Sequence, residues 1–332
     1  MAMDRRLLAW TTLAVALTLT SAIASLSIGP YRRVSLHQVA EWISGGSLPP
    51  LDEAILQVRL RRTLAGIIIG ASLAYAGANL QYLFRNPLAD PYVFGIASGA
   101  ALGVTLALYL GHADPAAVYA YSLAGALASL ALVVAGGLMG GGSPFSFIVV
   151  GVSLGYLLWS VSLILLSIMG PRSHLGFVWL FGTLAYASGR QLRLAAATLA
   201  LVWTASILLR SRYSKLLLGP DISSLRGTPY RRAAVELVVL SGVVTAAATA
   251  VSGPVGFVGV VAPWFARTTA GSLYGRFIAV STLWGATLVV LADTVNRLLG
   301  GAVELPLTGL LSLIGVPVVV YITLRSRGVK PW

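Results

Sequence analysis

The chain has 332 residues, of which 57% are hydrophobic and only 10% are charged. An ordinary soluble domain carries about 25% charged residues, so this composition excludes a water-soluble core. The formal net charge is +13, but the basic residues are scattered between apolar stretches and no aromatic platform accompanies them. We therefore interpret them as topology signals and predict no nucleic-acid partner. With no cysteine and three histidines far apart, the sequence offers no motif for a metal or a cofactor.

Apolar stretches recur along the whole chain, each near the ~20 residues that a helix needs to cross the hydrocarbon core. They predict an all-α polytopic membrane protein, with residues 1–332 forming one transmembrane domain. We expect about ten spans, with nine or eleven as alternatives. The expected spans are residues 7–28, 63–84, 92–110, 118–138, 146–168, 192–209, 232–251, 255–270, 277–300 and 307–324.

Two of these spans have alternative interpretations. The first could be a secretory signal, because Arg5 and Arg6 precede an apolar run. Its apolar stretch is longer than the roughly 7 to 15 residues of such signals, so we expect a retained helix. The eighth span is short and contains Pro263, which predicts a broken or half helix buried among its neighbours.

The distribution of lysine and arginine predicts the orientation. The most basic loop lies between the sixth and seventh spans, and basic loops of membrane proteins face the cytoplasm. With ten spans, both termini then lie in the cytoplasm, which agrees with Arg5, Arg6, Arg325, Arg327 and Lys330. The predicted location is the cytoplasmic (inner) membrane. The same topology leaves several arginines on the outer side, which requires a separate explanation.

The sequence contains no ATP-hydrolysing motif of its own. A P-loop needs lysine followed by serine or threonine. Lys215 precedes Leu216 and Lys330 precedes Pro331, so any ATPase must be a separate subunit, and we expect no enzyme activity in this chain. A stand-alone secondary transporter would need an ionisable residue inside the membrane. Asp293, four residues before Arg297, and Glu236 are the acidic candidates; that transporter class, or another integral-membrane protein such as an enzyme, remains the alternative.

Two blocks of sequence carry a more specific signal. In the first, prolines after the second span fix φ and disfavour helix in the residues before them, which predicts a rigid turn. This block contains Arg59, Arg62, Gly77, Gln81, Asn86, Pro87, Leu88, Ala89 and Pro91. The second block contains Gly256, Phe257, Gly259, Pro263, Arg267, Ala292, Asp293, Arg297, Glu304, Leu305, Pro306, Gly309, Gly315 and Pro317.

Together, in this order, the blocks closely resemble the permease family of type II ABC importers for iron-siderophore, haem and cobalamin. The chain departs from the family pattern at Arg61, Trp264 and Thr308, where proline, histidine and valine are usual. Because Trp264 cannot titrate, no role of the family's histidine is carried over to it. The resemblance implies a homodimeric permease with its pathway at the two-fold interface, two ABC ATPase subunits below it and an extracytoplasmic substrate-binding protein above it. Membrane lipid surrounds such a permease, and no catalytic residue or cofactor is implied.

The resemblance also implies three functional sites. Binding-protein docking falls on Arg59, Arg62 and Arg297, where the arginine fork can grip a carboxylate; contact with lipid headgroups is the alternative for Arg32, Arg33 and Arg61. ATPase coupling falls on a cytoplasmic segment at about residues 214–230, namely Leu218, Gly219, Asp221, Ile222, Leu225 and Gly227. Its apolar residues among charges suit a helix-in-groove contact, and a loop lying on anionic lipid is the alternative. The cytoplasmic gate falls on Asn86, Leu88, Pro144, Phe145 and Val149. Which metal complex is carried cannot be read from the sequence.

Overall fold

The computed structural model describes residues 2–29, 32–301 and 303–325, and within these ranges every regular element is a helix. The α-helices are α1 (Ala2–Ser27), α2 (Leu36–Ile43), α3 (Pro50–Phe84), α4 (Ile96–Tyr109), α5 (Pro115–Met139), α6 (Pro144–Ile168), α7 (His174–Leu180), α8 (Gly189–Leu208), α9 (Arg210–Tyr213), α10 (Pro220–Leu225), α11 (Tyr230–Ser252), α12 (Val258–Ala270), α13 (Tyr274–Gly300) and α14 (Leu307–Arg325). Three 3₁₀ turns join them: η1 (Pro91–Phe94), η2 (Gly170–Ser173) and η3 (Ser214–Leu218).

The predicted all-α membrane architecture is confirmed. Seven of the described helices are long and apolar enough to cross a membrane, and α4 and α14 are shorter apolar helices. The short helix α12, with Pro263 inside it, corresponds to the expected eighth span. Each of the ten expected spans therefore coincides with a helix.

The boundaries differ most at the second span, which was expected to start at residue 63. Helix α3 begins at Pro50 and is 35 residues long. Its first turns are charged and so lack the apolar signature of a span, but Pro50 at the first helical position and the acidic pair Asp52 and Glu53 favour a helix start there. The short helices α2 and α7 were not predicted from the sequence.

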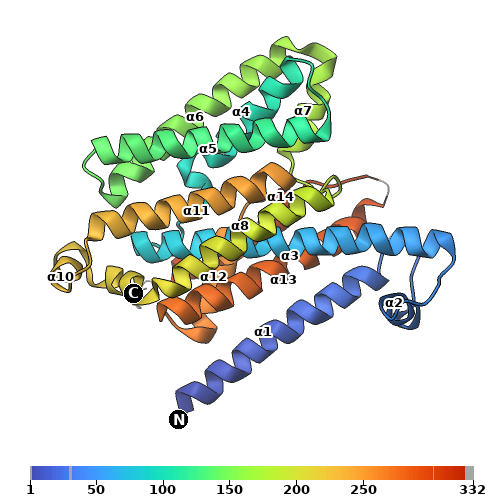
Figure 1. Cartoon of the computed structure of the whole chain (residues 1–332), viewed down its shortest axis with the longest axis horizontal. Helices are drawn as coiled ribbons and strands as arrows, with labels where there is room; N and C mark the ends of the chain where they lie inside the picture. The colour runs from blue at the N-terminus through green and yellow to red at the C-terminus, as the bar shows by residue number, and fades with distance from the viewer. Residues whose placement is uncertain (1, 30–31, 302, 326–332) are drawn as a thin grey trace.

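Helix α3 forms the centre of the bundle, with α4, α5 and α6 grouped on one side and α1 on the opposite side (Figure 1). In the most apolar stretch of each helix, 83% of residues are buried in α3 but only 17% in α6. Close glycine contacts hold α3 to its neighbours: a Cβ on Gly70 would lie 2.2 Å from the carbonyl oxygen of Gly285 on α13. Small residues at such crossings let backbones approach where no hydrophobic effect drives helix association.

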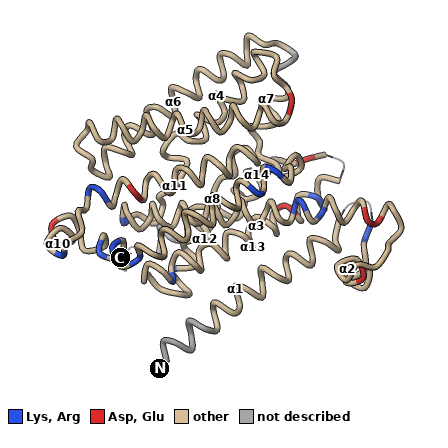
Figure 2. Tube along the Cα trace, in the orientation of Figure 1, with Lys and Arg blue, Asp and Glu red and all other residues tan. Residues whose placement is uncertain are grey.

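Helix α1 begins, and α14 ends, at the end of the bundle where α10 lies (Figure 1). Lysines and arginines gather at this end, while a second group of charges lies at the far end, near the start of α3 (Figure 2). We call these the α10 end and the far end. Arg327 and Lys330, which contributed to the predicted orientation, lie outside the described residues.

Candidate docking, coupling and gating sites

The three arginines predicted for docking come together at the far end. Arg59 and Arg62 lie one turn apart on α3, and Arg297 lies in the last turn of α13. Each side chain is largely buried, with 5%, 7% and 8% of its surface exposed respectively. The three arginines nevertheless line one open crevice of about 330 Å³, together with Glu304.

A carboxylate network holds Arg62 and Arg297. Arg62 donates hydrogen bonds to Asp293 at 2.6 Å and to Glu304 at 2.5 Å. The other oxygen of Asp293 accepts from Arg297 Nε at 3.1 Å, which confirms the predicted Asp293–Arg297 pair. Arg297 also donates to the hydroxyl of Ser25 on α1, at 2.6 Å. Charge-assisted pairs of this kind fix the guanidinium planes, so the floor of the crevice is preorganised.

Arg59 is held differently, by backbone carbonyls. It donates to Leu26 O at 2.8 Å and to Ser27 O at 3.0 Å, where α1 ends. These carbonyls belong to the last turn of a helix and have no intrahelical partner, and a cation there is favoured by the helix dipole. Arg59 therefore joins α1 to α3.

Glu304 is the acidic member of the crevice that we did not predict as a site residue. It lies in the connection between α13 and α14, and its side chain is 34% exposed. Burial opposes its charged form, but the hydrogen bonds and charge of Arg62 prevail and hold its pKa below the ordinary value. The signal in the sequence was Glu304-Leu305-Pro306, which carried family resemblance but no assigned contact.

The neighbouring arginine Arg61 is exposed and does not line the crevice. Arg32 forms an ion pair with the buried Asp52 at 3.0 Å. Exposed Arg61 and the buried, internally bonded Arg59 and Arg62 thus lie within one turn of α3, which provides a matched comparison for docking.

The predicted coupling segment, at about residues 214–230, forms η3 and α10 at the α10 end. Gly219, between η3 and α10, has φ +94°, a conformation that side chains rarely adopt. Ser223 Oγ donates to Lys215 O at 2.6 Å and Lys215 Nζ donates to Arg226 O at 3.0 Å, which folds the segment back on itself. Leu216, which belongs to η3, is buried.

Three apolar side chains of this segment are exposed. Leu218, Ile222 and Leu225 are 38%, 47% and 87% exposed. Asp221 and Gly227 are exposed as well, whereas Gly219 is buried. Three apolar side chains left uncovered next to charged residues match the expected amphipathic contact surface.

The residues predicted for the gate fall in two places at the same end. Asn86 accepts a hydrogen bond from Leu88 N at 2.9 Å, which closes the turn after α3 and leaves Leu88 41% exposed. Phe145 and Val149, on the first turns of α6, are 74% and 45% exposed. Pro144 lines a crevice of about 450 Å³ that is also lined by Pro220 and Ser224 of α10.

Arg85 connects the turn predicted for the gate to the segment predicted for coupling, and sequence reasoning missed it. It follows α3 with a positive φ of 50° and donates to Leu216 O at 3.0 Å. A displacement of η3 would therefore pull on the residue that begins the Asn86–Leu88 turn.

Comparison with known proteins decides the family. A match to the FecCD transport family spans residues 17–325. The chain belongs to the FecCD transport family. It is 34% identical over 279 residues to the hemin transport system permease protein HmuU of Yersinia pestis, covering 82% of this chain and 83% of that protein. It is 32% identical over 330 residues to the cobalamin import system permease protein BtuC of Halobacterium salinarum, covering 93% and 88%.

A solved structure shares the fold of this FecCD family member. It shows a metal-chelate type ABC transporter in an inward-facing conformation, with a TM-score of 0.84 and 28% sequence identity, covering 97% of this chain and 99% of that one. The similarity therefore extends over nearly the whole length of both chains.

The acidic residues considered for ion coupling are both paired in this family member. Asp293 bridges Arg62 and Arg297, and Glu236 pairs with Arg212 at 3.1 Å and with Arg232 at 3.2 Å. An ion-coupled carrier needs a carboxylate that exchanges its cation during the cycle. These two carboxylates serve instead as links between helices.

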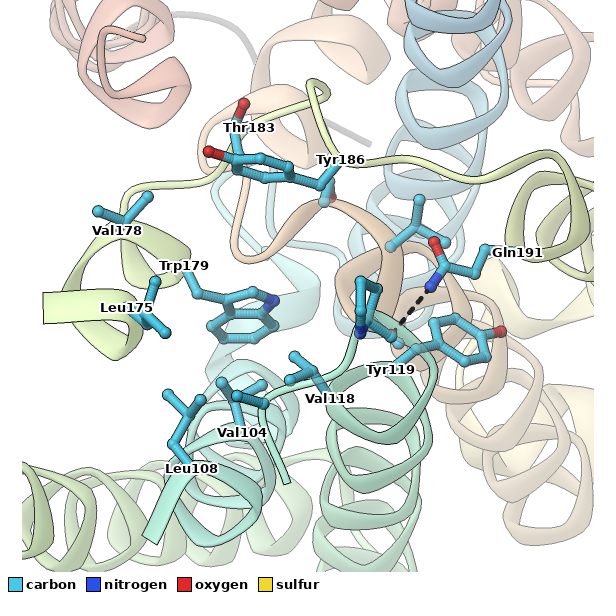
Figure 3. A pocket seen from close by; sticks show the side chains of 15 residues that line it. Val104, Leu108, Val118, Tyr119, Leu175, Val178, Trp179, Thr183, Tyr186 and Gln191 are labelled. Atoms are coloured by element: carbon cyan, nitrogen blue, oxygen red, sulfur yellow. Dashed lines mark hydrogen bonds between the residues drawn. The ribbon is translucent and has the colours of Figure 1, made fainter. Parts of the chain in front are cut away.

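A pocket of about 270 Å³ lies at the far end between α4, α5, α7, α8 and α11. Trp179 and Tyr119 contribute aromatic rings to its wall, and Gln191 donates to Pro115 O at 3.3 Å beside it (Figure 3). Its lining is mainly apolar and its volume is below the roughly 300 to 1,000 Å³ of typical small-molecule sites. It does not provide a path for a bulky metal complex.

Proposed function

We propose that this chain is the membrane-spanning permease of an ABC importer that carries a metal complex of the iron-siderophore, haem or cobalamin type. One observation carries the proposal: a single bundle has an arginine crevice at one end and, at the other, an exposed apolar helix beside the gate turn. An importer that receives cargo from a binding protein and energy from an ATPase needs both surfaces. The substrate class rests on the relatives named for hemin and cobalamin.

The ATPase is a separate subunit in this proposal. Neither lysine of the chain precedes serine or threonine, so the chain has no P-loop. Helix α10 presents Ile222 and Leu225 to the solvent, which suits insertion into a groove on a partner. Two such partners, one for each permease copy, would move α10 and, through Arg85, the gate turn.

The extracytoplasmic substrate-binding protein occupies the far-end crevice. Its carboxylates would reach Arg59, Arg62 and Arg297, whose planar forks are suited to bidentate contacts. Arg62 already binds Asp293 and Glu304. A carboxylate of the binding protein would therefore have to share this arginine with them or displace the partly exposed Glu304. The far end is then the outer face, and both termini lie in the cytoplasm.

The permease works as a homodimer in this proposal. Helix α6 carries many exposed apolar side chains, including Tyr156 at 73% and Leu157 at 60%. Part of this surface contacts lipid, and part would form the two-fold interface with the pathway between the copies. The gate residues Phe145 and Val149, on the same helix, would then face their counterparts.

Reconstitution tests the function. The chain, the ATPase subunit and the binding protein are placed in liposomes, and uptake of a panel of ferric siderophores, haem and cobalamin is measured with and without ATP. We expect ATP-dependent uptake of one class. Uptake by the permease alone, driven by an ion gradient, would instead establish the secondary-transporter alternative. ATP hydrolysis by the pure chain would contradict the proposal that a separate subunit hydrolyses ATP.

A further inference from the structure

We propose that helix α2 lies in the membrane–water interface of the outer leaflet, where an exposed apolar stripe on it contacts phospholipid. The stripe consists of Leu36, Ala40 and Ile43, which are four and three positions apart and therefore share one face of the helix. None of the sites described above uses it. The assignment to the outer leaflet rests on the proposed topology, in which the far end is outside.

Helix α2 crosses the direction of the spans. Figure 1 shows it nearly end-on, whereas α1, α3 and α13 run across the view. It lies at the far end, beside the end of α1 and outside the group of spans (Figure 1). A helix in this position runs along the surface of a bilayer, as interfacial amphipathic helices do.

The apolar residues of α2 form one continuous arc that the chain itself covers only in part. Val39 and Trp42 lie next to the stripe and pack in a cluster with Leu26 of α1. Leu36 and Ile43, in the stripe, are 63% and 70% exposed. Water would leave these two large side chains unfavourably solvated, whereas lipid would extend the apolar environment that Val39 and Trp42 already occupy.

The remaining features of α2 suit the headgroup region. His37 and Glu41 lie one turn apart on a polar face, and the His37 side chain is 89% exposed. Trp42 is half-buried and belongs to a residue type that concentrates at membrane–water interfaces. Arg33, exposed just before α2, can extend its guanidinium to a lipid phosphate while its stem lies along apolar surface.

Continuity with the surface of α1 favours lipid over a protein as the occupant. In the most apolar stretch of α1 only 22% of residues are buried, and Leu19 and Ile23 are among the exposed ones. Helix α2 follows α1 in the chain and packs against it. The stripe contains no charged residue, unlike the far-end crevice, so it offers a soluble binding protein none of the charge that would attract it.

Lipid contact at α2 would steady the junction between α1 and α3. Arg59 donates to Leu26 O at 2.8 Å and to Arg32 O at 2.5 Å, which lie before and after the link between α1 and α2. Gln38 of α2 donates to Asp52 of α3 at 3.2 Å. An anchored α2 would therefore help to hold the carbonyls that position Arg59. This consequence rests on the proposed function of Arg59 in docking, whereas the lipid contact itself does not.

Fluorescence quenching in nanodiscs tests the contact. The chain has no cysteine, so Ile43→Cys and His37→Cys each give one site for a fluorescent label. The quenchers are phosphatidylcholine with a nitroxide near the start of its acyl chain and iodide in solution. An interfacial helix places its apolar face about 5–10 Å into the headgroup–acyl boundary. We therefore expect the nitroxide to quench the label at position 43 at least about threefold more strongly than at position 37, and iodide to show the reverse order.

Iodide quenching of the two labels to the same extent, with no effect of the nitroxide on either, would overturn the proposal. Leu36→Cys provides a second site on the stripe if Ile43→Cys does not fold, with the melting temperature as the check. Nanodiscs expose both faces of the bilayer and no uptake is measured, so failure here would leave the proposed function standing.

Protection of the stripe from both quenchers would mean that a protein covers it, which also contradicts lipid contact. If that protection appears only when the binding protein is added, the stripe belongs to the docking surface. If it is present without a partner and is lost when the permease is reconstituted as single copies, the stripe belongs to an interface between two copies of the chain.

Discussion

The far-end crevice and the coupling segment differ in the kind of surface that each offers to a partner: the first is built from charged groups and the second from apolar groups. In the crevice the three arginines are buried and bonded to neighbouring groups of the chain, as in Arg62 with Asp293 at 2.6 Å. On α10 the apolar groups are exposed, with Leu225 at 87%. The far end therefore offers preorganised, salt-sensitive contacts suited to a partner that comes and goes, whereas α10 offers hydrophobic area suited to a lasting one.

The largest expected effect comes from removing the shared carboxylate at the far end. Asp293→Ala leaves two buried arginines without their common partner, which should lower the free energy of unfolding by about 3 to 5 kcal/mol. Thermal unfolding in detergent measures this. Glu53→Gln, at an exposed position on the same end, should change stability by no more than about 0.5 kcal/mol. Similar melting temperatures for the two variants would show that the network is not a structural element.

The second effect concerns α10. Leu225→Asp should leave folding intact, because the side chain is 87% exposed, and should weaken the ATPase contact by about 2 kcal/mol or more, roughly thirtyfold. Co-purification of the ATPase and ATP-dependent uptake report the loss. Arg226→Gln is the neighbouring control. Retained uptake in Leu225→Asp would make this segment a membrane-surface loop.

The third effect concerns docking at the far end. Arg59→Gln and Arg297→Gln should each slow association with the binding protein by about tenfold and reduce its dependence on ionic strength. Binding kinetics on permease in nanodiscs across a salt series measures this, with melting temperature as the check on folding. Arg61→Gln is the control, because Arg61 is exposed and lies outside the crevice. Equal effects at all three positions would indicate a diffuse basic rim.

The smallest effect sharpens the role of Glu304. If a partner carboxylate competes with Glu304 for Arg62, Glu304→Gln should speed docking by a few fold, because it removes a competing charge. The charge of the parent Glu304 is stabilised by Arg62, so its pKa is lowered and the competition should persist as the pH falls below 7, weakening only as the pH falls through that lowered value. Slower docking in Glu304→Gln would mean that Glu304 orients Arg62 rather than competing for it.

Local patterns accounted for the spans and for one ion pair. The Asp293–Arg297 pair follows from a spacing of four on one helix, so the sequence predicted it correctly. The start of α3 was predicted wrongly because hydropathy detects the membrane-embedded part of a helix, and the polar turns from Pro50 onward lack that signal. The contacts of Arg62 with Asp293 and Glu304 join residues more than 200 positions apart, which no local pattern reports.

The sequence by itself determined the membrane setting, the apolar helices and the two blocks that identify the family, because hydropathy and proline turns act over short distances along the chain. Tertiary structure decided which charges are buried and which are presented. Arg59 and Arg61 are two residues apart on α3, yet helix geometry points one toward α1 and leaves the other exposed. The presence of Pro144 and Pro220 in one crevice likewise depends on how helices distant in sequence pack together, since only packing brings their ends to one place.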